Sequence, residues 1–210
     1  MAAVAPLVYV VDDDDALRNA VITLLRSVAI EAKGFSSAAE FLGQPAPQQP
    51  TCLILDIRMP HLSGFDIQHE LKARDRDMPI IFVTGYGTIP MTVRAMKAGA
   101  VEFLTKPFEE DDLLEAVRNA LARGEADWRH RVERIALSSR YAKLTARERE
   151  VMEQVVQGRL NKEVASRLGT SEITVKVHRR HVMEKMEADS FADLVRMAEK
   201  LQVSSASPVC

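Results

Sequence analysis

Residues 7–15 read LVYVVDDDD, a short apolar run that ends in four aspartates. An apolar run without polar alternation is typical of a strand covered on both faces of a parallel sheet. Similar runs, rich in Val, Ile, Leu and Phe, follow at residues 52–56, 80–84 and 101–105, and a weaker one lies at 30–34. The first 123 residues therefore predict five strands.

Helical patterns separate these strands. They cover residues 16–28, 37–42, 65–73, 90–98 and 111–123. A regular alternation of strand and helix requires crossover connections, which produce a parallel sheet with helices on both faces. We therefore expect residues 1–123 to form an α/β domain with a doubly wound, five-stranded parallel sheet of the flavodoxin type.

The segment 124–142 is polar and rich in Arg, Glu and Ala. Trp128, Val132 and Ile135 are spaced so that they would share one face of a helix. The segment can extend the preceding helix as a connector, or it can be a flexible linker in which the stripe is incidental. The sequence leaves both alternatives open.

Residues 143–204 predict a small all-α domain. Thr145 and Glu148 have the spacing of a capping box in front of a helix that Gly158 ends. A second helix over 162–168 ends at Gly169. Two more helices are expected, from residue 171 or 172 to 186 and from 190 to 201. Two short helices that meet at a tight, glycine-containing turn are typical of a helix-turn-helix domain.

Composition narrows the class of protein. No apolar run approaches the roughly 20 residues that span a bilayer, and the two cysteines, Cys52 and Cys210, suggest neither a disulfide framework nor a metal site. We therefore expect a cytoplasmic protein without a membrane partner. Residues 1–123 hold 12 basic and 17 acidic residues, whereas 124–210 hold 16 and 13. This asymmetry indicates cations near the first part and nucleic acid near the second.

Five chemically active side chains lie at predicted strand ends, where open parallel sheets bind their ligands. They are Asp12, Asp13, Asp56, Thr84 and Lys106. Three carboxylates at one edge repel each other unless a cation neutralises them. Oxygen ligands suit a hard divalent ion such as Mg²⁺, which could draw a phosphoryl group toward a carboxylate nucleophile. The hydroxyl and the ammonium would bind the remaining phosphoryl oxygens.

Motifs of competing phosphoryl chemistry are missing. Hydrolases of the haloacid dehalogenase type need Asp-x-Asp, and Arg58 occupies the second position. The P-loop pattern G-x-x-x-x-G-K-[ST] does not occur. The pair Gly85 and Gly87 lacks the third glycine of a dinucleotide-binding fingerprint. The sequence thus predicts that the chain is not an enzyme.

The motifs VVDDDD, LDIRMP, VTGYG and the pair Lys106-Pro107 resemble the receiver domain of two-component response regulators over nearly all of residues 1–123. The resemblance implies that Asp56 is the phosphoacceptor. It also implies that Asp13 binds Mg²⁺ directly, that Asp12 binds it through water, and that the backbone carbonyl of Arg58 completes the protein ligands. Thr84 and Lys106 would bind the phosphoryl group, and the bond before Pro107 would be cis. Phe103 matches the aromatic switch position of the family, although the same residue could simply be core.

The stretch 144–186 resembles the DNA-binding domain of the LuxR/FixJ type through LTxRExxV, Asn161 to Ala165 and TVKVH. The helix over 173–185 also carries four Lys and Arg residues against one acid, as expected of a helix that meets phosphates and base edges. By the family pattern, Lys176, Val177 and Arg180 would face the major groove. The expected phosphate contacts are Lys162, Thr174, Arg179 and Lys185.

As a whole, the chain resembles the FixJ subgroup of response regulators. The resemblance implies a transcription factor that a sensor histidine kinase phosphorylates on Asp56, and that then forms a homodimer and binds promoter DNA as double strands. An activator is favoured, with RNA polymerase as a further partner. The expected dimer face comprises Val93, Arg94, Lys97 and Ala98. Two alternatives remain: a DNA-binding protein that works without phosphorylation, and a signalling protein whose C-terminal helices bind protein instead of DNA.

Overall fold

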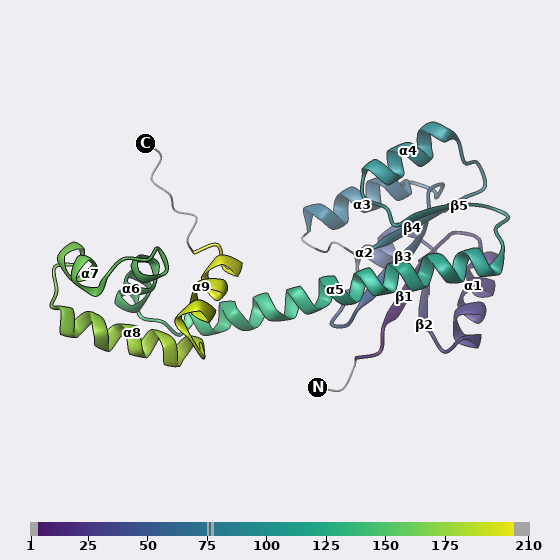
Figure 1. Ribbon diagram of the computed structural model, residues 1–210. Helices are drawn as coiled ribbons and strands as arrows, with labels where there is room; N and C mark the ends of the chain where they lie inside the picture. Colours follow the sequence, from purple (N-terminus) through teal and green to yellow (C-terminus); the bar gives the residue numbers. More distant parts are fainter. Residues whose placement is uncertain (1–3, 75, 77, 204–210) are drawn as a thin grey trace. The chain divides into compact units, whose positions relative to one another are not determined.

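A computed structural model of the chain describes residues 4–74, 76 and 78–203. These residues form two compact units, which divide between Arg129 and His130 (Figure 1). The last residue of the expected helix-turn-helix domain, Ser204, and the terminal Cys210 lie outside the described residues.

The first unit is built on a parallel sheet with the strand order β2-β1-β3-β4-β5 (Figure 1). The strands are β1 (Leu7–Val11), β2 (Glu31–Phe35), β3 (Thr51–Asp56), β4 (Ile80–Thr84) and β5 (Glu102–Thr105). The direction of winding reverses between β1 and β3, which is the position where open α/β sheets bind ligands. The prediction of a doubly wound, five-stranded parallel sheet is confirmed.

Helices cover both faces of this sheet. They are α1 (Asp15–Ser27), α2 (Ala38–Leu42), α3 (Gly64–Ala73), α4 (Ile89–Lys97) and α5 (Glu110–Ala142). The start of α5 packs with α1 on one face, and α2, α3 and α4 cover the other (Figure 1). Each of the four shorter helices begins within one residue of the start expected from the sequence.

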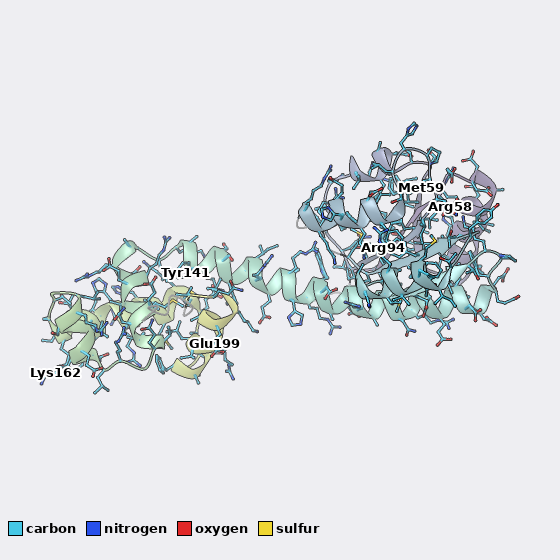
Figure 2. The ribbon with its side chains drawn as sticks, turned by 90° about the horizontal axis from the view of Figure 1, so that it is seen from above. Arg58, Met59, Arg94, Tyr141, Lys162 and Glu199 are labelled. Atoms are coloured by element: carbon cyan, nitrogen blue, oxygen red, sulfur yellow. The ribbon has the colours of Figure 1, made fainter. Side chains whose placement is uncertain are left out.

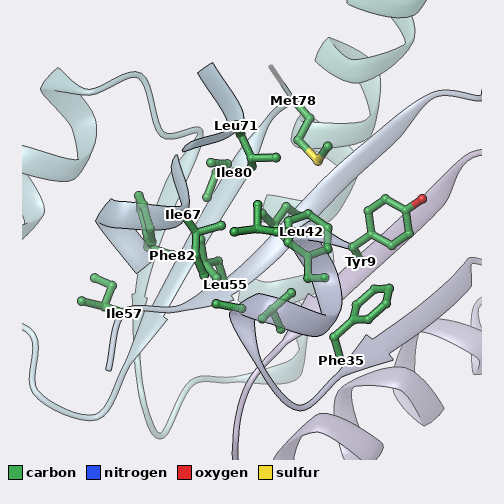
Figure 3. Packing of buried hydrophobic residues seen from close by; sticks show 14 of the residues in the cluster. Tyr9, Phe35, Leu42, Leu55, Ile57, Ile67, Leu71, Met78, Ile80 and Phe82 are labelled. Carbon is green, nitrogen blue, oxygen red and sulfur yellow. The ribbon is translucent and has the colours of Figure 1, made fainter. Parts of the chain in front are cut away.

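Two hydrophobic cores lie on opposite faces of the sheet. Alternate residues of β1 serve different cores: Val8 and Val10 face α1 and α5, whereas Tyr9 and Val11 face the side of α2 and α3. Figure 3 shows the second core, where the rings of Tyr9 and Phe35 meet edge to face at 5.7 Å. Because both faces are buried, the three central strands β1, β3 and β4 are apolar at nearly every position, whereas the edge strands β2 and β5 are more polar.

Helix α5 includes the segment 124–142, which the sequence left open as helix or linker. We expected a helix over 111–123, and α5 continues to Ala142. The helix runs through Gly124, where a β-carbon would lie 2.5 Å from the main-chain oxygen of Thr51. The glycine permits close packing of α5 on β3. Arg, Glu and Ala favour helix beyond this point. Neither α5 nor any other helix in the described part of the chain combines the length and apolarity needed to cross a membrane.

The apolar stripe expected on the segment 124–142 is only partly buried. Trp128 and Val132 are half-buried, but Ile135 is 61% exposed. Leu137 is the buried residue of this part of α5, with 3% of its surface exposed. It lines a shallow pocket together with Met197, near an ion pair between Glu133 and Lys200. The helical alternative is therefore the one found, and Leu137 is buried instead of Ile135.

The second unit is helical. It contains the end of α5 followed by α6 (Ala146–Val156), α7 (Asn161–Arg167), α8 (Glu172–Met186) and α9 (Phe191–Lys200). The expected capping box is present: Thr145 Oγ1 accepts from the Glu148 N–H, and Glu148 accepts from the Thr145 N–H. Gly169, at a φ of 60°, lies in the turn between α7 and α8. The predicted helix-turn-helix architecture is confirmed.

Candidate functional site

Three side chains from distant parts of the sequence meet at the carboxyl ends of the strands. Asp12 follows β1, Asp56 ends β3 and Lys106 follows β5. The Nζ atom of Lys106 lies 2.7 Å from Oδ2 of Asp12 and 2.5 Å from Oδ2 of Asp56. Both aspartates are buried, with 2% and 5% of their surfaces exposed. The ammonium therefore compensates one of the two negative charges of this buried pair and is shared between them.

Asp13 completes an acidic cluster. One carboxylate oxygen from each of Asp12, Asp13 and Asp56 lies within 4.8 Å of the others, and Asp13 is the exposed member. Oxygen donors at this spacing suit a hard divalent cation, and an exposed member leaves room for bound water. The donor set fits Mg²⁺.

Burial and charge act against each other in this cluster. Burial raises the pKa of Asp12, although the hydrogen bonds from Lys106 and from the Asp14 N–H oppose the change. Burial also disfavours the charged form of Lys106, but its contacts with the two aspartates outweigh this and raise its pKa. A proton and a metal ion would compete for this cluster, because both would interact with the carboxylate oxygens of Asp12 and Asp56 that Lys106 contacts.

Main-chain groups fix the orientation of both buried aspartates. Oδ1 of Asp56 accepts a hydrogen bond from the Arg58 N–H at 2.8 Å, which places the main chain of Arg58 beside the cluster. Oδ1 of Asp12 accepts from the Asp14 N–H at 3.0 Å. Arg18 of α1 donates to the main-chain oxygen of Asp12 at 2.7 Å. The role of Arg18 could not be predicted from the sequence, because a cation one turn into a helix gives no pattern of its own.

Thr84 lies at the end of β4 and is fully buried. Its Oγ1 accepts a hydrogen bond from the Tyr86 N–H at 3.3 Å, and its main-chain oxygen accepts from the Lys106 N–H at 2.8 Å. The bond between Lys106 and Pro107 is cis, as expected. Thr84 and Lys106 are thus connected through their backbones at neighbouring strand ends.

Phe103 in β5 is half-buried and packs against the core on the side of α2 and α3. Its Cε1 would lie 3.2 Å from a β-carbon placed on Gly87. The ring therefore lies against the loop between Thr84 and α4. The position of Phe103 is compatible with both interpretations, the core residue and the switch residue that responds to the loop.

The first unit also holds two contacts between an arginine and an aromatic ring that the sequence did not indicate. The guanidinium of Arg58 lies 4.4 Å from the ring centre of Tyr86. That of Arg94 lies 4.3 Å from the ring centre of Phe65 and so connects α4 with α3. Figure 2 labels Arg58 and Arg94 in the first unit.

The expected dimer face on α4 is largely exposed. Val93 is 46% exposed, and Arg94 and Lys97 are exposed as well. Ala98 differs, because it is half-buried and its main-chain oxygen accepts hydrogen bonds from Gln68 and Lys72 of α3. Ile89 and Met96, which the sequence analysis did not include, extend the apolar part of this surface with 82% and 44% exposure.

The outward side of α8 carries three of the residues expected to meet DNA. Lys176, Val177 and Arg180 are exposed. Lys176 lies 3.8 Å from Glu172, and Arg180 lies 3.4 Å from Glu184, both across one helical turn. Lys162 at the start of α7, labelled in Figure 2, is exposed too.

The other expected phosphate contacts have partners within the domain. Arg179 donates to Oδ1 of Asn161 at 3.2 Å and lies 4.6 Å from the ring centre of Phe191. The Thr174 hydroxyl lies 2.8 Å from that of Ser171, which caps α8. Lys185 donates to Glu148 at 2.6 Å. Their contacts with DNA stay a prediction, and these partners give each of them a structural role as well.

Glu148 connects α6 with α8 and was identified from the sequence only as a capping residue. It is 3% exposed, and its Oε2 accepts from both Lys185 and the Thr145 N–H. Burial opposes its ionisation, but these donors outweigh burial and hold its pKa at about 2. His181 lies 3.7 Å from its other oxygen. Lys185 already neutralises the Glu148 carboxylate. We therefore interpret Glu148 and Lys185 as an ion pair inside the domain.

Comparison with known proteins agrees with both halves of this arrangement. Residues 8–118 match the family described as response regulator receiver domain, and residues 142–198 match the bacterial regulatory proteins of the luxR family. The chain belongs to the response regulators with a LuxR-type DNA-binding domain. As a response regulator of this family it is a transcription regulator and not an enzyme.

Relatives of this response regulator are similar along nearly the whole chain. Nodulation protein W of Bradyrhizobium diazoefficiens is 48% identical over 97% of this chain and 90% of that protein. The transcriptional regulatory protein FixJ of Azorhizobium caulinodans is 44% identical over 91% of this chain and 90% of its own. Among solved structures, the response regulator StyR is 45% identical with a TM-score of 0.79, covering 94% of this chain and all of that one.

Proposed function

We propose that this response regulator accepts a phosphoryl group on Asp56 from a sensor histidine kinase. The observation that carries the proposal is the contact of Lys106 with both Asp56 and Asp12 at one strand-end crevice. An oxygen of Asp56 attacks phosphorus, and the bond from phosphorus to the donor's histidine nitrogen breaks. Lys106 is already within reach of the product's oxygens, and a charge-assisted contact to phosphate is stronger than a neutral one.

Mg²⁺ is the proposed cofactor. Asp13 and Asp56 would hold it directly, Asp12 through water, and the main-chain oxygen of Arg58 would complete the ligands. When bound, the ion offsets negative charge on the phosphoryl oxygens. The hydrogen bond from the Arg58 N–H to Asp56 supports this assignment, because it keeps the main chain of residue 58 at the cluster.

Phosphorylation is proposed to act through Thr84 and Phe103. Thr84 is buried next to the crevice, and Phe103 lies against the loop that follows it. The added charge draws the Thr84 hydroxyl toward the phosphoryl group, and the ring of Phe103 turns inward. The surface with Val93, Arg94, Lys97 and Ala98 then pairs with its copy in a homodimer of two-fold symmetry.

The dimer is proposed to activate transcription at promoters with two half-sites. Lys176, Val177 and Arg180 enter the major groove, and Lys162, Thr174, Arg179 and Lys185 contact phosphates. The exposure of the first three residues on one side of α8 supports this division. RNA polymerase is the proposed further partner. The proposed domain limits are 1–123, 124–142 and 143–204, and the proposed location is the cytoplasm.

The test compares the chain with its Asp56→Asn variant in the presence of Mg²⁺ and a small phosphodonor. We expect the wild type to take up one phosphoryl group, to become dimeric, and to bind promoter DNA more tightly. Asp56→Asn should do none of these, since an amide cannot form the acyl phosphate. Intact-protein mass, size by light scattering and DNA affinity provide the three readouts.

Asp112→Asn is the matched control, because Asp112 is an exposed aspartate in the first turn of α5. It should behave as the wild type in all three measurements. A wild type that takes up no phosphoryl group but binds DNA would favour the phosphorylation-independent alternative. DNA affinity that does not fall with added salt would favour a protein partner for the C-terminal helices.

A further inference from the structure

One more residue, Ile173, lies on the outward side of α8, one turn before the residues assigned above to the major groove. Ile173 lies three and four positions before Lys176 and Val177, and Arg180 follows at the next turn. On a helix this spacing places all four residues on one face. Ile173 is 75% exposed and Val177 is 44% exposed. Neither residue therefore belongs to the core of the second unit.

The core is made from a different side of the same helix. Val175, Val182 and Met186 have no exposed surface and pack with residues of α6, α7 and α9. The domain thus folds without help from Ile173. Ile173 is therefore free to contact a ligand that binds this side of α8, and its burial there would contribute about 2 kcal/mol.

The charged residues around Ile173 indicate which kind of partner binds this side of α8. Lys176 and Arg180 lie on the same face as Ile173 and Val177, and Lys162 is exposed at the start of α7. An apolar pair between cations matches the major groove, where phosphates border base edges. The methyl group of thymine is the apolar feature of those edges. A purely apolar protein groove would leave these cations desolvated and unpaired.

The position of Ile173 along α8 also favours DNA as the partner. Ser171 caps α8, so Ile173 is the second residue of the helix. In helix-turn-helix proteins, side chains near the start of the second helix reach the base edges. We propose that Ile173 contacts the 5-methyl group of a thymine and, beside Val177, determines the sequence preference at the base pair nearest the start of α8. This inference rests on the proposed DNA-binding role of α8 and adds a specificity residue to it.

The experiment starts from the full chain treated with a phosphodonor. Duplexes selected from a random pool by this protein supply a binding sequence. Each thymine of that sequence is then replaced by deoxyuridine, which lacks only the methyl group. For the wild type we expect at least two thymines per half-site at which the replacement weakens binding about fourfold, the factor that one buried methyl group confers.

Three variants assign these methyl groups. Ile173→Ala should bind the thymine and uracil duplexes equally at one of the positions and keep the difference at the other. Val177→Ala should show the reverse pattern. Ile135→Ala is the control, because Ile135 is an exposed isoleucine of α5, and it should keep both differences. Since Ile173 is exposed, its replacement should leave the helical circular dichroism unchanged.

Two results would overturn the inference. In the first, uracil serves as well as thymine at every position for the wild type. In the second, Ile173→Ala keeps the wild-type difference at every thymine. A pool from which the phosphorylated chain enriches no sequence contradicts the proposed function itself, and this outcome is distinct from the other two because no binding sequence is obtained.

Discussion

The Nζ atom of Lys185 in α8 lies 2.6 Å from Oε2 of Glu148 in α6, and the carboxylate is almost completely buried. Removing one partner of a buried ion pair leaves the other uncompensated. We expect Glu148→Gln to lower the free energy of unfolding of the second unit by about 2 kcal/mol. Hydrogen exchange of the α8 amides measures this. Glu150→Gln, which removes an exposed partner of Arg147, should cost less than about 0.5 kcal/mol.

The same carboxylate predicts a dependence of stability on pH. Its pKa is about 2 in the folded chain, compared with an ordinary value of 4.5. As the pH falls, the unfolded chain binds the proton first. The stabilisation is therefore complete above about pH 4.5 and is lost as the pH falls toward 2. Urea unfolding from pH 6 to pH 2, followed on α8, should show this loss in the wild type. Glu148→Gln should have a flatter profile, and an identical profile would contradict the prediction.

A divalent cation at this cluster would share the carboxylates of Asp12 and Asp56 with Lys106, so we expect the two cations to compete. In Lys106→Met the ammonium is gone, and the three carboxylates of the cluster repel each other without compensation. We expect this variant to bind Mg²⁺ several-fold more tightly than the wild type in a calorimetric titration. Lys97→Met removes an exposed lysine from α4 and should leave the affinity unchanged. Weaker binding by Lys106→Met would show that the lysine does not compete with the ion.

Gly124 should resist replacement by alanine. In a helix, alanine is normally favoured over glycine by about 1 kcal/mol. Here the new β-carbon would meet the main chain of Thr51 at 2.5 Å, and such overpacking costs about 1–3 kcal/mol. We expect a lower melting temperature for Gly124→Ala. For comparison, Ala126→Gly changes an exposed position of the same helix. It should lose only the stability that comes from the higher helix propensity of alanine. A stabilised Gly124→Ala would mean that α5 can move away from β3.

Replacing Lys162 should affect only DNA binding, whereas replacing Arg179 should affect both DNA binding and stability. Lys162→Ala takes away an exposed cation, so we expect the slope of log affinity for DNA against log salt to fall by about 0.9 while the stability is kept. Arg179→Ala also breaks the contacts with Asn161 and Phe191, so it should lower the melting temperature of the second unit as well. Fluorescence titrations over a range of salt, with a thermal melt of each variant, separate the two effects.

Much of the fold could be predicted from local sequence. Uninterrupted apolar runs marked the strands, and β5 begins only one residue later than expected. The continuation of α5 through 124–142 was left open, because a polar segment rich in Arg, Glu and Ala suits a helix and a linker equally well. The packing of Gly124 on Thr51 depends on tertiary structure, which no local pattern contains. The choice of Leu137 over Ile135 for burial is of the same kind, since both residues would suit an apolar face.

For the candidate sites, strand topology made prediction possible. Once the strands are parallel, their carboxyl ends meet, and Asp12, Asp56 and Lys106 come together although they are far apart in sequence. Side-chain partners within the domains could not be foreseen. Lys185 and Arg179 were expected only as phosphate contacts, yet they bond Glu148 and Asn161 inside the domain. Whether a lysine faces water or a buried carboxylate is decided by the neighbouring helix.

The two sides of α8 have separate tasks, and this bears on how such regulators diverge. Val175, Val182 and Met186 hold the helix in its domain, while Ile173, Lys176, Val177 and Arg180 take no part in the core. Substitutions among the latter four can change which operators a descendant recognises without weakening the scaffold. A duplicated copy of this gene could therefore acquire new targets in single steps, each of them tolerated by the fold.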